Sequence, residues 1–119
     1  MREILESLGD RFGVRGSLLL TRDGVVVASA LQKDMDAESV AALASAIISE
    51  AARATARLAL GPTRRMILTA GFGRLLFEPF EELVLVVAIE PGLDIEHTLL
   101  EIAGPARRIR EQSRLDASP

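Results

Sequence analysis

The chain has 119 residues, 49% of them hydrophobic, and carries a net charge of −3. This length suits one domain with its own core, because about two thirds of the unfolded surface can be buried at this size. The acidic balance argues against nucleic-acid binding as the main function, since phosphate affinity requires a clustered positive surface. The chain has no cysteine, which excludes disulfides, thiolate zinc sites and cysteine nucleophiles.

No segment resembles a targeting or membrane sequence. Acidic residues interrupt the first six positions, where a signal peptide would have an uninterrupted apolar stretch. The longest apolar run, residues 83–89, is far too short to span a bilayer. We therefore expect a cytoplasmic protein without membrane insertion.

The first part of the chain predicts a short helix followed by a β-hairpin. Apolar residues recur at helical spacing with charges between them, at Ile4, Leu5, Leu8 and Phe12. Asp23-Gly24 then lies between two short apolar runs. Asp-Gly between β-formers favours a tight turn, because its residues tolerate positive φ. The strands are expected at about residues 15–21 and 25–31.

A long helix is expected over residues 36–60, with Asp36 as its N-cap and Gly61-Pro62 at its end. Its apolar stripe comprises Val40, Leu43, Ala44, Ile47, Ile48, Ala51, Thr55 and Leu58. Opposite this stripe we place a second row of small residues, Ala41, Ala42, Ser45, Ser49, Ala52 and Ala56. Small residues let another backbone approach closely, so this row predicts an interface. The alternative is an alanine-rich surface that simply favours the helix.

Three further strands form a predicted meander. They are expected at residues 65–70, at residues 74–78 with Pro79 ending the strand, and at residues 83–89. The last of these runs shows no alternation of apolar and polar residues. Such a run is typical of a central strand that is covered on both faces.

The last segment is helical again, starting near Leu93. Gly104-Pro105 predicts a kink or a break within it, because proline removes a backbone donor and clashes with the preceding turn. We expect residues 1–113 to form a single domain and residues 114–119 a frayed tail. The predicted order is helix, hairpin, long helix, three-strand meander and helix.

The sequence contains no catalytic motif. A P-loop requires Gly-Lys-Ser/Thr, but the one lysine, Lys33, follows Gln32. The one histidine, His97, excludes a multi-histidine metal site within one chain, and no nucleophile–base pair can be assembled. We therefore expect no catalytic residues, no cofactor and no metal, and hence no enzyme activity.

Two surface features leave alternatives open. The Gly71-Phe72-Gly73 turn could present Phe72 to a partner or bury it in the hairpin. The last segment carries a group of arginines, Arg107, Arg108, Arg110 and Arg114. These arginines could contact an acidic surface, although a solvated helix face is the simpler interpretation.

Residues 13–24, with the sequence Gly-Val-Arg-Gly-Ser-Leu-Leu-Leu-Thr-Arg-Asp-Gly, are similar to the opening hairpin of Roadblock domains. This family includes the dynein Roadblock light chains and the bacterial MglB-like proteins. The helix at 36–60 matches the long small-residue helix of the family. The turn at Gly71, the segment 77–80 and the apolar strand to Ile89 match its closing meander. The resemblance covers essentially the whole chain, and the order and spacing of these segments carry it.

The resemblance implies a profilin-like α/β fold with the order α-β-β-α-β-β-β-α. Its five-stranded antiparallel sheet has the strand order 2-1-5-4-3, with helices on both faces. Residues 65–70 then form an edge strand without proline or inward charge. Family members join two sheets at this edge across a two-fold axis, with the long helices side by side. The implied dimer and partner interface comprises Ala41, Ala42, Ser45, Ser49, Ala52, Arg53, Ala56, Arg65, Ile67 and Thr69.

The resemblance also implies a function, namely a non-catalytic homodimer that acts with a Ras-like small GTPase as a regulator or scaffold subunit. MglB-like members stimulate GTP hydrolysis by a small bacterial GTPase. One alternative is a structural adaptor that is indifferent to the nucleotide. Another is a small-ligand sensor, because profilin-like folds hold ligands against the sheet. The 3% aromatic content and the few polar residues in the predicted core disfavour a specific ligand pocket.

Overall fold

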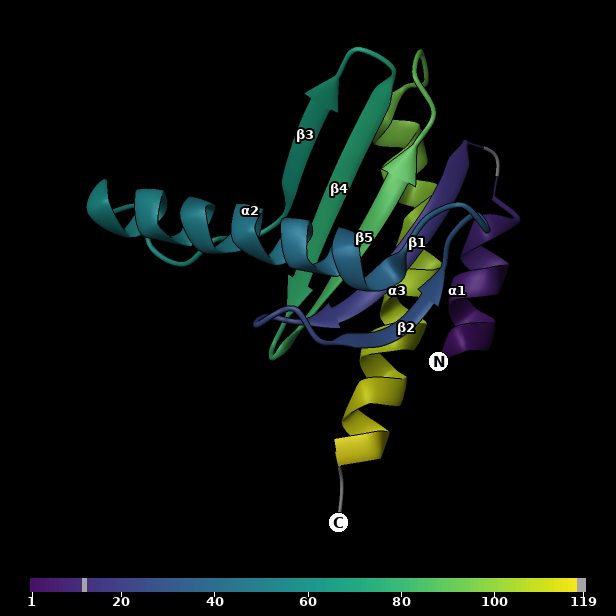
Figure 1. Cartoon of the computed structure of the whole chain (residues 1–119), viewed down its shortest axis with the longest axis horizontal. Helices are drawn as coiled ribbons and strands as arrows, with labels where there is room; N and C mark the ends of the chain where they lie inside the picture. Colours follow the sequence, from purple (N-terminus) through teal and green to yellow (C-terminus); the bar gives the residue numbers. More distant parts are fainter. Residues whose placement is uncertain (12, 118–119) are drawn as a thin grey trace.

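A computed structural model describes residues 1–11 and 13–117 of the chain (Figure 1). Helices and strands follow one another along the chain in the predicted order, α-β-β-α-β-β-β-α. The elements are α1 (Arg2–Gly9), β1 (Val14–Thr21), β2 (Val26–Ala30), α2 (Ala37–Arg57), β3 (Met66–Ala70), β4 (Gly73–Phe80), β5 (Leu83–Ile89) and α3 (Ile95–Ala117). Phe12, which was expected at the end of the first helix, lies outside the described residues.

The five strands form one antiparallel sheet in the order β2-β1-β5-β4-β3, which confirms the predicted strand order. Helices α1 and α3 pack on one face of the sheet, and α2 crosses the other face (Figure 1). The sheet therefore has helices on both faces, as predicted.

The two faces of the sheet have separate cores. The core under α1 and α3 contains Leu5, Leu8, Leu19, Leu76, Leu85, Val87, Ile89, Ile102 and Ile109. The core under α2 contains Leu18, Leu20, Ala41, Ala44, Ile48, Phe77, Val84 and Val86. Strand β5 contributes alternate residues to both cores, so its unbroken apolar run is explained by its central position.

Local sequence signals position the first hairpin and α2. Gly24 has φ +95° in the turn between β1 and β2, a conformation that glycine adopts without strain. The Asp36 side chain accepts a hydrogen bond from the Glu38 N–H at 3.3 Å, which confirms the predicted N-cap. Helix α2 ends at Arg57, three residues earlier than expected, and Ala59 beyond it has φ +57°.

Strand β4 continues through Pro79, so the prediction that Pro79 ends this strand is wrong. Phe80 and Leu83 pair on either side of the two-residue turn between β4 and β5. Pro79 precedes Phe80 in β4 and lies opposite Val84. Because hydrogen-bonded and non-bonded pairs alternate, the Pro79 nitrogen points away from β5. Strand β3 begins opposite Phe77 and leaves that side of Pro79 without a neighbouring strand. The missing N–H therefore removes no ladder bond.

Helix α3 runs without interruption through Gly104-Pro105, so of the expected kink or break, the break is wrong. Proline removes one intrahelical bond at this point. However, Pro105 is itself buried, and Ile102 and Ile109 anchor the helix in the core on either side of it. The helix also continues to Ala117, so residues 114–117, expected in a frayed tail, are helical. Within the described residues, no helix combines the length and apolarity that crossing a membrane requires.

Candidate interaction surface

Strand β3 is an uncovered edge of the sheet. Its partner strand is well packed, with Leu76 and Phe77 buried, but four of the five residues of β3 are exposed. Ile67 is 42% exposed on the α1/α3 side, and Leu68 is 46% exposed on the α2 side. The strand contains neither proline nor charge. An apolar edge of this kind is a template for pairing with another strand.

The register of the β3–β4 hairpin shows which backbone groups of β3 are free. Ala70 and Gly73 close a two-residue connection and are therefore a hydrogen-bonded pair. Alternation along the ladder then directs the N–H and C=O groups of Ile67 and Thr69 away from β4, towards the open edge. Both residues are in the dimer and partner interface that the resemblance to Roadblock domains implies.

Arg65 fixes the start of this edge strand. Its Nε lies 2.5 Å from Oε2 of Glu78 on β4, and the Glu78 side chain is only 16% exposed. The pair holds the residue that precedes β3 against the neighbouring strand. This ion pair connects the start of the exposed edge strand to β4.

Helix α2 extends beyond the edge of the sheet. Figure 1 shows the helix crossing the strands, with its C-terminal part projecting past β3. Its buried residues, Ala41, Ala44 and Ile48, pack against residues of the sheet. In the C-terminal half of α2, Ala52, Arg53 and Ala56 are exposed.

The structure divides the predicted row of small residues into two groups. Ala41 is fully buried against the sheet, and half-buried Ser45 donates a hydrogen bond to the Arg22 carbonyl at 3.0 Å. Neither residue lies opposite the buried stripe. Conversely, Leu43, which was expected in the apolar stripe, is 69% exposed. The sequence interpretation assumed that large apolar side chains mark the inward face, whereas α2 packs closely on the hairpin through alanines. The other predicted interface residues are exposed, namely Ala42, Ser49, Ala52, Arg53, Ala56, Arg65, Ile67 and Thr69.

On the α2 side, a strip of the sheet next to the helix is uncovered (Figure 1). Leu68, Leu75 and Ala88 lie opposite one another on β3, β4 and β5 and line a shallow hollow of about 310 Å³. Phe72, at the tip of the β3–β4 turn, also lines this hollow and is 85% exposed. Of the two alternatives for Phe72, burial in the hairpin is therefore wrong.

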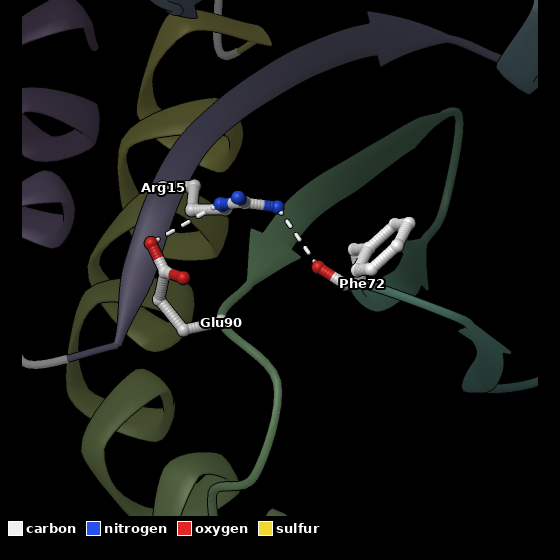
Figure 2. A network of polar contacts seen from close by, with 3 residues as sticks. All are labelled: Arg15, Phe72 and Glu90. Atoms are coloured by element: carbon white, nitrogen blue, oxygen red, sulfur yellow. Dashed lines mark hydrogen bonds and ion pairs between the residues drawn. The ribbon is translucent and has the colours of Figure 1, made fainter.

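Arg15 fixes the position of the β3–β4 turn (Figure 2). Its Nη1 donates a hydrogen bond to the Phe72 carbonyl oxygen at 3.0 Å, while its Nε pairs with Glu90 Oε1 at 3.1 Å. The turn is thereby tied to β1 and to the end of β5, and the Phe72 ring is directed outward. Sequence reasoning missed Arg15, because no local pattern relates a β1 residue to a turn 57 positions later.

His97 and Glu81 belong to separate ion pairs on the surface. His97 is exposed on α3, with its Nε2 3.8 Å from Oε1 of Glu101. Glu81 pairs with Arg114, whose Nε lies 3.4 Å from Glu81 Oε1. In the part of the chain that the structure describes, no three histidine or acidic side chains are grouped as a metal site would require.

Comparison with known proteins identifies the family of this chain. The Roadblock/LC7 domain family model matches residues 2–88. An uncharacterized protein of Methanocaldococcus jannaschii is 29% identical over 107 residues, covering 90% of this chain and 94% of its own length. A second protein of that organism, also uncharacterized, is 32% identical over 92 residues, covering 77% of this chain and 81% of its own length.

Two solved structures share the fold. The Roadblock/LC7 domain from Streptomyces avermitilis superposes with a TM-score of 0.84 at 23% identity, covering 96% of this chain and 98% of that one. MglB from Myxococcus xanthus superposes with a TM-score of 0.89 at 14% identity, covering 99% and 90% of the two chains. Members of the matched family are generally non-catalytic regulators. The chain belongs to the Roadblock/LC7 domain family.

Proposed function

We propose that this chain is a homodimeric regulator or scaffold subunit that acts with a Ras-like small GTPase. Membership of the Roadblock/LC7 family supports a regulatory role associated with GTPases. The sequence supports the absence of nucleotide chemistry in the chain itself, because it lacks a P-loop and a nucleophile–base pair. In this proposal, any GTP hydrolysis takes place in the partner.

The observation that carries the dimer is the complementarity between the projecting part of α2 and the uncovered strip of the sheet. Each chain has a helix end with no sheet beneath it and a sheet strip, Leu68, Leu75 and Ala88, with no helix above it. A two-fold rotation about the β3 edge would put the projecting helix of each copy over the strip of the other. Such an isologous contact is closed and does not propagate into fibres.

The dimer also satisfies the free backbone groups of β3. In an antiparallel pairing of two β3 strands, the outward N–H and C=O groups of Ile67 and Thr69 bond to the partner strand. The exposed residues of α2, including Ala42, Ser49 and Arg53, then lie beside the seam on the outer surface. We assign the GTPase contact to this outer surface of the paired α2 helices.

A proline substitution tests the dimer at its edge. Thr69→Pro removes a single N–H, and that N–H points away from β4, so the β3–β4 hairpin is retained. We expect multi-angle light scattering to give the mass of a dimer for the wild type and of a monomer for Thr69→Pro. Thr69→Ala, which keeps the N–H, is the matched control and is expected to remain dimeric. A monomeric wild type, or a dimeric Thr69→Pro, would rule out this dimer.

The GTPase assignment has a separate test. The purified chain is mixed with each Ras-like GTPase of its source organism, loaded with GDP or with a non-hydrolysable GTP analogue. Co-elution in the GTP-analogue state, with an altered rate of phosphate release from GTP, is the expected result. Equal binding in both states with unchanged turnover would instead indicate a structural adaptor. Absence of binding in either state would contradict the proposal.

A further inference from the structure

A second groove lies on the α1/α3 face of the sheet, between α3 and the β3 edge. It is lined by residues of α3, β4 and the start of β3, with a volume of about 200 Å³. The lining residues are Arg65, Leu76, Glu78, Leu99, Ile102, Ala103, Ala106, Arg107 and Arg110. The groove exists because α3 packs towards α1 and leaves the β3 side of this face open.

The floor of the groove is apolar and continues to the edge of the sheet. Leu76 and Ile102 are buried beneath it, and Leu99 and Ala106 are half-buried. Ile67 lies directly opposite Leu76 in the β3–β4 ladder, so its 42% exposed side chain is on the same face. The floor therefore runs from α3 across two strands.

Small side chains line the α3 side of the groove. Ala103 is exposed, and together with Ala106 it lets an approaching helix come close to α3 without displacing side chains. Leu100 is 75% exposed and lies one turn before Ala103 on the same side of the helix. A large exposed apolar residue beside two alanines is suited to packing against an apolar stripe.

The rim of the groove is positively charged in a chain whose net charge is −3. Arg65, Arg107 and Arg110 lie on it, and Glu78, the one acidic lining residue, is already paired with Arg65. Among the described residues, exposed Arg107 has neither an ion-pair nor a hydrogen-bond partner. The rim thus favours a ligand with carboxylates, and the floor favours a ligand with apolar side chains.

We propose that this groove binds an acidic amphipathic helix of a partner protein. Apolar residues of that helix at i, i+3, i+4 and i+7 spacing would cover Leu76, Ile67 and Ala103. Its carboxylates would reach Arg107 on the rim. The lining segment of α3 from Leu99 to Arg110 is about 16 Å long, which matches about three turns of a partner helix.

This inference does not depend on the proposed dimer or GTPase. The groove and α2 lie on opposite faces of the sheet. If two β3 strands pair, Ile67 still presents its side chain to the α1/α3 face, where it continues the floor of the groove. The two proposals can therefore fail independently.

The test uses a fluorescein-labelled peptide of about 15 residues, with leucines at helical spacing and glutamates between them. We expect its fluorescence anisotropy to rise on titration with the full-length chain, and binding to weaken with salt. Arg107→Glu should weaken binding about ten-fold, because an attraction becomes a repulsion. Arg108→Glu is the matched control, since Arg108 is also exposed on α3 but does not line the groove. It should bind like the wild type.

Two further peptides separate a specific groove from general attraction to negative charge. Replacing the glutamates with lysines should abolish binding, and replacing the leucines with glutamines should do the same. Circular dichroism of Arg107→Glu checks that the fold is kept. Equal weakening by Arg107→Glu and Arg108→Glu, undiminished binding of the leucine-free peptide, or no binding of the first peptide would each overturn the proposal.

Discussion

Ser45 and Arg22 are joined by a hydrogen bond in which Ser45 Oγ donates to the Arg22 carbonyl oxygen at 3.0 Å. The bond ties α2 to the turn between β1 and β2. Gly24 in the same turn lies so close to the helix that a Cβ built on it would be 3.2 Å from the Ser45 Cβ. Ser45 therefore supports the fold of the single chain, and a large side chain at this position would disturb that fold before it affected any dimer.

Replacing Ser45 tests this structural role. Ser45→Ala removes the hydrogen bond to Arg22, so we expect the free energy of unfolding to fall by about 1 kcal/mol in urea denaturation. The mass measured by light scattering should not change. Ser49→Ala is the control, because Ser49 is exposed on the same helix and makes no side-chain hydrogen bond to a described residue. If both substitutions lowered stability equally, the Ser45 bond would not be the cause.

The β3–β4 turn requires glycine at position 73. Gly73 has φ +153°, and a Cβ on it would lie 2.7 Å from the Ile89 carbonyl oxygen. We expect Gly73→Ala to lower the free energy of unfolding by about 2 kcal/mol or more, measured by chemical denaturation. Gly71→Ala, in the same turn, meets no atom within 4 Å and should change stability little. A Gly73→Ala variant as stable as Gly71→Ala would show that the turn relaxes without cost.

Ser17 is a buried polar residue in the middle of β1. It is 1% exposed, and its Oγ has no hydrogen-bond partner within the described part of the chain. A buried hydroxyl without a partner loses its bonds to water on folding. We therefore expect Ser17→Ala to raise the thermal midpoint, with a gain of about 1 kcal/mol in the free energy of unfolding. A lower midpoint would mean that the hydroxyl is satisfied in solution.

The fold could be predicted because local signals and the order of elements agree. Asp23-Gly24 marked the first turn, Asp36 marked the start of α2, and the unbroken apolar run at β5 marked the sheet centre. Each of these signals depends on neighbouring residues alone. The strand order itself came from the resemblance to Roadblock domains, because local patterns do not determine how distant strands pair.

The candidate surface was only partly predictable, because it depends on how α2 crosses the sheet. Ala41 and Ala52 are the same residue type on the same helix, yet Ala41 is buried and Ala52 is exposed. The difference arises from tertiary packing, because Ala41 belongs to the core between α2 and the sheet and Ala52 does not. Arg15 and Phe72 were likewise brought together by tertiary structure, through a contact between residues 57 positions apart.

Gly104 provides a direct test of the uninterrupted helix α3. It lies inside the helix with an ordinary negative φ, and a Cβ on it would meet no atom within 4 Å. Alanine restricts the unfolded chain and has a higher helix propensity than glycine, so Gly104→Ala should raise the free energy of unfolding by about 0.5–1 kcal/mol. A break before Pro105 that required glycine would give the opposite sign. Urea denaturation of Gly104→Ala, with Gly73→Ala measured alongside as the destabilising reference, distinguishes the two cases.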